Sequence, residues 1–361
     1  MKKDFNILTG PLDWGLGHAS RCVPLIRILS EKGVNVIPAA SGAGASFLLE
    51  EFPGMEIVPL NEYGITYPSG GSMAWHMMRQ SPAILRSIRK EHRLLDDLID
   101  RHRIDAVISD NRFGLWSKRI PSIYITHQLA VRAPAPLSFT GGLLYRLHGR
   151  FIKRFDECWI PDTKGPGSLA GDLAHQRPAR IPAYFIGPQS RFANHKGKRS
   201  KTYDLMAIIS GPEPQRSIFE SMVIRQLGET CLKALVLLGK PGKAVETEQR
   251  GNLTICPHMD TERMQEAIMS SELILCRSGY SSIMDLASTG SRAVLVPTPG
   301  QPEQEYLASY HMAKRNYYSV SQKELNIARV FQAARNYPGI RTENDQAVLH
   351  KRIDALLMRL G

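Results

Sequence analysis

The chain has 361 residues, of which 43% are hydrophobic and 22% are charged. This length accommodates two domains with separate cores, and the composition excludes a disordered chain. The net charge of +12 and the sequence pI of about 9.5 predict an anionic partner: a nucleotide, acidic lipid headgroups or a nucleic acid. Aromatic residues make up only 7%, and no RRM, KH or helix-turn-helix pattern occurs, so we expect no nucleic-acid partner.

The five cysteines stand at positions 22, 158, 231, 256 and 276 and never approach a CxxC spacing. Their number is odd, and most of them lie in apolar runs. We therefore interpret them as reduced residues of a cytoplasmic protein, with neither a disulfide framework nor a metal site. No apolar run approaches the roughly 20 residues that span a bilayer. We expect a soluble or peripheral membrane protein, the inner face of the plasma membrane being the alternative location.

The first half of the chain alternates short buried strands with helical segments. We expect strands at 5–9, 34–38, 56–59, 106–109, 122–126 and 157–160, the last of them closing this half. We expect helices at 19–32, 46–51 and 84–101. This alternation predicts an α/β domain with a parallel, doubly wound sheet over residues 1–187.

A polar and basic segment interrupts the apolar pattern, and we place a linker at 188–202. A second alternating series follows over 203–340. Its strands are expected at 204–209, 234–238, 253–256, 273–276 and 293–296. The remaining segment, 341–361, contains a final helix from 345 to 360 with apolar residues on one face.

The most informative stretch is 274–285, followed by 293–297 and 301–305. It reads as a buried strand, a small-residue turn at Ser278 and Gly279, the start of a helix, a second buried strand and a polar loop. Such a turn presents free backbone N–H groups and the positive end of a helix dipole at one point, which suits a phosphate. Asp285 lies about one turn inside that helix, where its carboxylate can accept hydrogen bonds from a ribose diol.

The order of these parts resembles the donor half of GT-B glycosyltransferases, especially family 28. The resemblance implies two Rossmann-like domains that face a central cleft, with the last helix packing back toward the first domain. It also implies an enzyme that transfers a sugar from a nucleotide sugar. When the sugar is transferred, the leaving group is the nucleoside diphosphate. Inverting GT-B enzymes stabilise this leaving group with helix dipoles and side chains. No DxD metal motif is apparent, and we expect neither a metal nor a cofactor.

The resemblance places thirteen residues around the nucleotide sugar. They are Arg191, Ser210, Gly211, Gln215, Arg216, Arg277, Ser278, Gly279, Tyr280, Ser281, Asp285, Gln304 and Glu305. The chain departs from the family at two of them. Asp285 stands where the family has a ribose-binding glutamate, and Glu305 replaces the second of two glutamines. A carboxylate beside a diphosphate is unfavourable unless it binds sugar hydroxyls, so Glu305 leaves the donor sugar open.

A second glycine-rich loop, residues 10–21, follows the first predicted strand. It is not the GxGxxG dinucleotide fingerprint, but it resembles the first loop of family 28, which faces the acceptor. A histidine at the start of a helix stays neutral near pH 7, as a general base requires. His18 is therefore the leading candidate for the base, and Asp13 is the alternative. Gly15 and Gly17 let the backbone approach the acceptor closely.

Polar residues follow two further strands of this half. Asp110 ends one strand, and His127 and Gln128 follow the next, at the sheet edge where α/β proteins bind ligands. We expect acceptor contacts from these three residues, with structural capping as the alternative. Residues 143–155 mix apolar and basic side chains, which is typical of a helix on an anionic membrane or of a covering helix with a solvated edge.

These features together favour an inverting, metal-independent glycosyltransferase. It would move a hexose or an N-acetylhexosamine from a nucleotide sugar, a UDP-sugar by resemblance, to a hydroxyl of a saccharide or a lipid-linked acceptor. The alternative is a UDP-N-acetylglucosamine 2-epimerase-like isomerase on the same fold, with acidic residues around the sugar ring. The sequence leaves the sugar, the nucleobase and the acceptor open.

Overall fold

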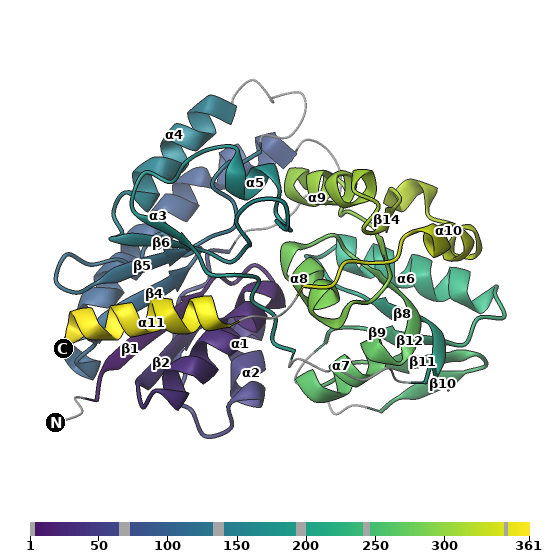
Figure 1. The fold of residues 1–361 in the computed structure, drawn as a ribbon, viewed down its shortest axis with the longest axis horizontal. Helices are drawn as coiled ribbons and strands as arrows, with labels where there is room; N and C mark the ends of the chain where they lie inside the picture. Colours follow the sequence, from purple (N-terminus) through teal and green to yellow (C-terminus); the bar gives the residue numbers. More distant parts are fainter. Residues whose placement is uncertain (1–3, 65–72, 133–140, 193–199, 241–245, 343–345) are drawn as a thin grey trace. The chain divides into compact units, whose positions relative to one another are not determined.

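The computed structural model describes residues 4–64, 73–132, 141–192, 200–240, 246–342 and 346–361, without the side chains of 73–78. It divides into two compact units, shown in Figure 1. The first comprises Met1–Ile65, Ala74–Arg191 and Asn344–Gly361, and the second contains Phe192–Glu343. The division between Arg191 and Phe192 falls within the segment that we assigned to the linker, of which residues 193–199 lie outside the described residues.

The sheet of the first unit has seven strands in the order β3-β2-β1-β4-β5-β6-β7, and all its pairings are parallel. They are β1 (Asn6–Pro11), β2 (Asn35–Ala40), β3 (Val58–Pro59), β4 (Ala106–Asp110), β5 (Ser122–Ile125), β6 (Glu157–Ile160) and β7 (Ala183–Phe185). The strand order reverses between β1 and β4, as in doubly wound folds that bind ligands at this point.

Helices cover both faces of this sheet because successive strand residues point to opposite sides. The helices are α1 (Leu16–Glu31), α2 (Gly42–Glu51), α3 (Met73–His102), α4 (Gly141–Ile152), α5 (Asp172–His175) and α11 (Ala347–Leu360). Ile7 of β1 belongs to one buried cluster, with residues of α1, α2 and α11. The adjacent Leu8 belongs to another, with residues of α3.

The second unit repeats this plan with a seven-stranded sheet in the order β10-β11-β9-β8-β12-β13-β14. Its strands are β8 (Tyr203–Ile208), β9 (Ala234–Leu237), β10 (Glu248–Arg250), β11 (Leu253–Cys256), β12 (Ser271–Cys276), β13 (Ala293–Leu295) and β14 (Tyr318–Ser319). Its helices are α6 (Gln215–Gly228), α7 (Thr261–Met269), α8 (Tyr280–Thr289), α9 (Pro302–Ala313) and α10 (Ile327–Ala333), with short 3₁₀ turns η2 (Gln322–Glu324) and η3 (Ala334–Asn336). Only the β10–β11 pairing is antiparallel among the pairings of the described residues.

The prediction of two parallel-sheet α/β domains is confirmed. Three strands were missed, β7, β10 and β14, because they are only two or three residues long and none contains a buried residue. The prediction that 157–160 is the last strand of the first half is therefore wrong. Three helices begin earlier than expected, at Leu16, Gly42 and Met73. The first two have glycine-containing first turns, which lack the apolar periodicity used to predict them.

The terminal helix α11 packs on the first unit. Leu349, Ile353 and Leu356 are buried in the same cluster as the residues of α1. At its polar face, Arg352 contacts both carboxylate oxygens of Glu157, at 2.8 and 2.9 Å, and lies over the ring of Tyr184 at 3.7 Å. In the described part of the chain, no helix combines the length and the apolar character that crossing a membrane requires.

Replacing Ile353 tests the packing of α11. Its side chain is fully buried, so Ile353→Ala should lower the free energy of unfolding of the first unit by about 2–5 kcal/mol. Urea unfolding followed by tryptophan fluorescence reports on this unit, because all 4 tryptophans of the chain, at 14, 75, 116 and 159, lie within it. Met358→Ala is the control on the same helix, since Met358 is 80% exposed and should change stability by less than about 0.5 kcal/mol. Equal effects of the two substitutions would contradict the packing described.

Candidate active site

The carboxyl ends of β1 and β4 bring two predicted site segments together. These strands pair in parallel with Pro11 opposite Asp110, and the Leu12 N–H donates to the Asp110 carbonyl at 2.9 Å. The loop after β1 therefore leaves the sheet beside the Asp110 side chain. Because β5 pairs with β4 on its other side, the segment from Thr126 to Gln128 begins at the same edge. Residues that are far apart in the sequence therefore lie close together at this edge, for example His18 and Asp110, which are 92 positions apart.

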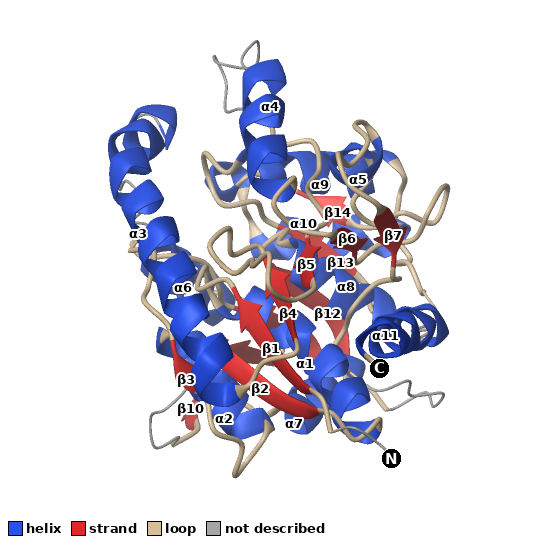
Figure 2. Cartoon of the chain, turned by 90° about the vertical axis from the view of Figure 1, so that its left-hand side faces the viewer, coloured by secondary structure: helices blue, strands red, loops and turns tan. Residues whose placement is uncertain are grey.

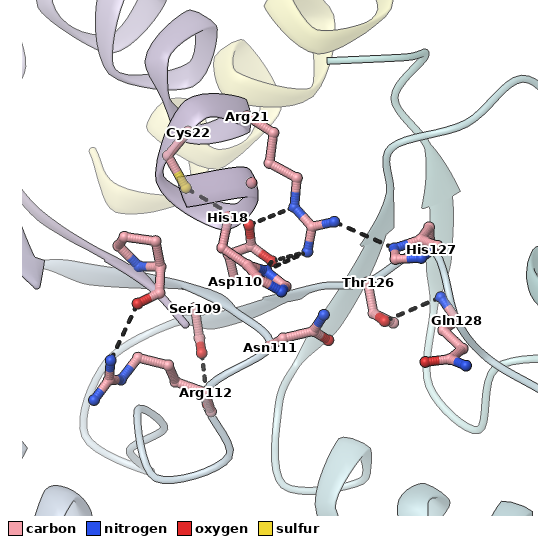
Figure 3. A network of polar contacts seen from close by, with 12 residues as sticks. His18, Arg21, Cys22, Ser109, Asp110, Asn111, Arg112, Thr126, His127 and Gln128 are labelled. Carbon is pink, nitrogen blue, oxygen red and sulfur yellow. Dashed lines mark hydrogen bonds and ion pairs between the residues drawn. The ribbon is translucent and has the colours of Figure 1, made fainter. Parts of the chain in front are cut away.

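Helix α1 begins directly after this loop. Gly15 precedes it with a φ of 73°, a left-handed conformation that favours glycine. His18 lies in the first turn of α1, and Arg21 follows three residues later on the same side of the helix. Both side chains therefore point at Asp110 (Figure 3).

Arg21 and Asp110 form a buried ion pair. Arg21 Nε donates to Asp110 Oδ2 at 2.5 Å, Nη2 donates to Oδ1, and only 3% and 1% of the two side chains are exposed. The Cys22 thiol lies 3.7 Å from Oδ2. Burial by itself would raise the pKa of Asp110, but the Arg21 guanidinium and the His18 ring outweigh burial and hold that pKa well below its usual range. Asp110 is a carboxylate at every physiological pH.

His18 lies against this pair. Its Nδ1 is 3.2 Å from Asp110 Oδ1 and 2.8 Å from Arg21 Nη2, and 14% of its side chain is exposed. Burial lowers the pKa of His18, and the Arg21 charge lowers it further, while Asp110 acts in the opposite direction. The ring is therefore neutral at neutral pH, and donation from Nδ1 to Asp110 would leave Nε2 as an unprotonated acceptor.

His127 joins the same network, whereas Gln128 does not. His127 is 4% exposed, and its Nδ1 lies 3.2 Å from Arg21 Nη1. Gln128 is half-buried and uses its backbone N–H to reach Thr126 Oγ1 at 3.1 Å. Figure 3 shows the Gln128 side chain directed away from Asp110. Of the predicted acceptor residues, Asp110 thus contacts the candidate base directly, and His127 contacts Arg21 beside it.

Asp13 lies in a separate cluster. Its Oδ2 accepts from the Tyr63 N–H at 2.8 Å, and its buried Oδ1 has no hydrogen-bond partner among the described residues. The Tyr63 hydroxyl donates to Glu91 at 2.6 Å, and Glu91 also pairs with the fully buried Arg112. Arg112 donates to the Pro11 carbonyl at 3.1 Å. This second buried ion pair anchors the loop that carries Asp13.

In the second unit, Arg277 connects loops at the carboxyl edge of the sheet. Its guanidinium donates to the carbonyls of Gln215, Val296 and Pro297 at 3.1, 3.4 and 3.3 Å. It stacks over Phe219 at 4.0 Å and is 1% exposed. Burial lowers the pKa of Arg277 to about 10, so it stays protonated at neutral pH. Its side chain therefore joins the loops after β8, β12 and β13 rather than facing solvent.

The predicted turn and the polar loop also meet in this unit. The buried Ser278 donates its hydroxyl to the Gln304 carbonyl at 2.8 Å, and the Gln304 side-chain oxygen accepts from the Thr298 N–H at 2.9 Å. Glu305 Oε1 accepts from the Gly300 N–H at 3.0 Å. The Glu305 carboxylate therefore caps its own loop. Thr298 is fully buried, and its hydroxyl has no hydrogen-bond partner among the described residues.

The more accessible residues at this edge come from all three loops. Helix α8 starts at Tyr280 after Gly279, with no side chain capping its first turn, and Tyr280 is 3% exposed. The exposed or half-buried residues of the predicted donor set are Ser210, Gly211, Gln215, Gly279, Ser281, Asp285, Gln304 and Glu305. Backbone amides at the start of a helix suit an anion, and those of α8 stay the predicted phosphate contacts.

The other two predicted arginines already have partners. Arg216 contacts Glu213 at 3.2 Å and Glu220 at 3.0 Å, which balances its charge, and it also donates to the Leu238 carbonyl. Arg191 lies in the first unit, where its guanidinium stacks over Phe47 at 5.2 Å. Both are 9% exposed. Diphosphate contacts from these two side chains stay predictions.

Arg21 is the site residue that the sequence reasoning missed. Its spacing of three from His18 was the available signal, because residues at i and i+3 share a helix face. Within the described ranges, no group of three or more His, Cys, Asp or Glu side chains is placed to hold a metal ion.

A known family model matches most of the second unit. Residues 217–345 match the family model of the glycosyltransferase family 28 C-terminal domain. A relative from Pasteurella multocida, named UDP-N-acetylglucosamine–N-acetylmuramyl-(pentapeptide) pyrophosphoryl-undecaprenol N-acetylglucosamine transferase, is 25% identical over 184 residues. The match covers 50% of this chain and 47% of that protein. The chain thus spans about half the length of the curated relatives that it matches, 47% and 55% for two of them.

Solved structures resemble the chain over almost its whole length. The glycotransferase of kitacinnamycin matches with a TM-score of 0.60 and 16% identity, over 98% of this chain and 94% of that one. MurG of Acinetobacter baumannii matches with a TM-score of 0.55 and 14% identity, over 98% and 100%. At these identities the likeness concerns the fold. The predicted GT-B fold and the predicted resemblance to family 28 glycosyltransferases are confirmed. The predicted central cleft depends on the relative placement of the two units and stays a prediction.

Asp110→Asn tests the buried ion pair. The substitution removes the charge that balances Arg21 in this cluster, so we expect the free energy of unfolding of the first unit to fall by about 3–5 kcal/mol. Urea unfolding followed by tryptophan fluorescence measures this change in the free energy of unfolding. Asp100→Asn removes the partner of Arg119 in an exposed pair and serves as the control, with little expected change. A stable Asp110→Asn protein would show that the pair does not hold the edge together.

Proposed function

We propose that the chain is a glycosyltransferase that moves a hexose or an N-acetylhexosamine from a nucleotide sugar to an acceptor hydroxyl. The match of residues 217–345 to the family 28 C-terminal domain supports the reaction class, and the name of the Pasteurella relative supports UDP-N-acetylglucosamine as the donor. The observation that carries the proposal is the contact of neutral His18 with Asp110 at the start of α1. The relatives reported above are named as transferases, so the epimerase alternative has no support among them.

The second unit supplies the donor site in this proposal. The amide groups at the start of α8 and the Ser210–Gly211 turn bind the diphosphate, since both lie at the carboxyl edge of the sheet and both include half-buried or exposed residues. Asp285 accepts hydrogen bonds from the ribose. The protonated Arg277 keeps the loops in place and adds positive charge behind the diphosphate. As the bond to the sugar breaks, these fixed dipoles stabilise the leaving diphosphate.

The first unit supplies the base. His18 donates Nδ1–H to the Asp110 carboxylate, and Nε2 then takes the proton of the acceptor hydroxyl as its oxygen attacks the anomeric carbon. The attacking oxygen enters on the face opposite the diphosphate, so a single displacement inverts the anomeric configuration. The developing imidazolium is stabilised by Asp110. No step in this sequence requires a metal, because the dipoles of α8 take the charge of the leaving group.

Asp13 is less suited to the role of the base. Its Oδ2 already accepts the Tyr63 N–H, which ties the side chain to its neighbouring loop. His18, in contrast, has a carboxylate partner that fixes the ring and stabilises its charged form after proton transfer. We therefore propose His18 as the base and Asp13 as a residue that orients the first loop, with Gly15 and Gly17 leaving room for the acceptor.

Helices α3 and α4 provide a surface suited to anionic lipid, which we call the α3–α4 surface. Both helices project at one end of the first unit (Figure 2), and they are joined by the apolar cluster that includes Ile84 and Phe151. Its exposed apolar and basic residues are Leu85, Arg86, Arg89, Lys90, Arg93, Leu143, Arg146, Leu147 and Arg150. Basic and apolar side chains together favour an anionic membrane surface, here the inner face of the plasma membrane, and a lipid-linked acceptor.

Asp285→Ala should weaken UDP binding by about 1–3 kcal/mol, because a charged hydrogen-bond acceptor is lost. Isothermal titration calorimetry measures the affinity. Glu229→Ala removes an exposed carboxylate elsewhere in the second unit and should leave UDP binding unchanged. Equal affinity of the Asp285→Ala and wild-type proteins would reject the assigned ribose site.

His18→Ala should lower kcat by about 10²–10⁴, the usual loss for a general base, while UDP affinity stays the same. The assay follows UDP release from UDP-sugars with saccharide acceptors. Asp13→Asn provides the comparison and should lose less activity than His18→Ala. If Asp13→Asn abolishes turnover and His18→Ala does not, the roles of the two residues are reversed.

Leu147→Glu should reduce sedimentation of the protein with anionic phospholipid vesicles, because it places a negative charge on the α3–α4 surface. Leu147 is 44% exposed. Ile218→Glu alters a side chain in the second unit that is 43% exposed and should leave vesicle binding intact. If the wild-type protein does not sediment with anionic vesicles, or sediments equally well with neutral ones, this surface is excluded as the membrane contact.

A further inference from the structure

The contacts of Arg21 extend beyond the ion pair with Asp110. Its Nη2 reaches Nδ1 of His18 at 2.8 Å, and its Nη1 reaches Nδ1 of His127 at 3.2 Å. One buried guanidinium from α1 thus contacts both imidazoles and the carboxylate at this edge (Figure 3). A residue that only neutralised Asp110 would not need to touch either ring.

The guanidinium restricts which nitrogen of each neighbouring imidazole can carry a hydrogen. Arginine has five N–H donors and no acceptor, so Nδ1 of His127 must accept in its contact with Arg21. Nδ1 of His18 faces Asp110 Oδ1 as well as Arg21, and in the proposed base it donates to Asp110, so the approach of Arg21 Nη2 is a repulsive contact and not a hydrogen bond. In this contact the hydrogen of the His127 ring lies on Nε2, with Nδ1 facing Arg21. At His18, full protonation would place an imidazolium beside a guanidinium, with only 2.8 Å between the nearest nitrogens. The Arg21 charge therefore disfavours the imidazolium form of His18.

Arg21 and His18 share the carboxylate of Asp110. It donates to both oxygens of Asp110, whereas His18 reaches only Oδ1, at 3.2 Å. A carboxylate that faced His18 alone would raise the pKa of the ring by attraction. Here the guanidinium opposes that attraction, although Asp110 still favours the imidazolium that forms on proton transfer. The groups facing His18 are Arg21 on α1, Asp110 on β4 and His127 after β5.

We propose that Arg21 is a positioning residue that keeps His18 unprotonated and oriented as the base, and that holds His127 in its Nε2–H form. This inference rests on the proposed role of His18. With Arg21 present, the base stays available to lower pH than the histidine of a simple carboxylate–histidine pair. After proton transfer, the same repulsion speeds loss of the proton from His18 and returns the ring to its starting state.

Titration of ¹⁵N-histidine-labelled protein by NMR tests the inference without an activity assay, with His18→Gln and His127→Gln used for assignment. In the wild type, His18 should titrate below the ordinary value of about 6.5 and His127 should show the Nε2–H pattern. Arg21→Gln should raise the His18 midpoint by about 1 unit or more, the effect of one adjacent charge, whereas Arg21→Lys should keep it low. A wild-type midpoint at or above 6.5, or no shift in Arg21→Gln, would overturn the proposal.

Because Arg21→Gln leaves Asp110 buried without its main partner, that variant is paired with the double substitution Arg21→Gln/Asp110→Asn, which removes both charges. His18 in the double variant should titrate nearer its ordinary value than in the wild type. The pH profile of kcat supplies the functional readout: its acid limb should move to higher pH in Arg21→Gln. An NMR shift as expected, together with full activity of His18→Ala, would uphold the effect of Arg21 on the ring and reject the proposed base.

Discussion

Parallel strand pairing is the constraint on which both candidate sites depend. When β1 pairs in parallel with β4, and β8 with β12, the loops after each pair must leave the sheet at the same edge. His18 and Asp110, 92 positions apart, become neighbours for this reason. The same constraint brings the Ser278 turn to the loop that precedes α6. An antiparallel arrangement would send these loops to opposite edges.

Buried arginines hold these edges in both units. Arg21 and Arg112 pair with Asp110 and Glu91 in the first unit, whereas Arg277 donates only to carbonyls in the contacts described for it. Burial of a guanidinium is costly unless its donors are satisfied, so each arginine fixes the loops that satisfy it. The result is a rigid frame around accessible polar groups. Proton transfer and diphosphate binding both require such a frame, because misplaced donors lose their effect on the transition state.

Much of this organisation is predictable from the sequence, since long apolar strands and glycine turns carry strong local signals. The strand–turn–helix at 274–285 appears as β12 and α8. Individual site residues such as His18, Asp110 and His127 were also identified, but as separate groups. Their contact depends on the β1–β4 register, which no local pattern contains. The partners of Arg216 and the burial of Arg277 were missed for the same reason: a charged residue beside a loop looks exposed until its tertiary partners are known.

Hydrogen–deuterium exchange with and without UDP tests the central claim most directly, namely that the second unit binds the nucleotide at the start of α8. The account predicts slower exchange on UDP binding for the amides of 279–282 and 210–211, because these N–H groups donate to the diphosphate. Unchanged exchange there, or protection confined to residues 10–18 of the first unit, would contradict it.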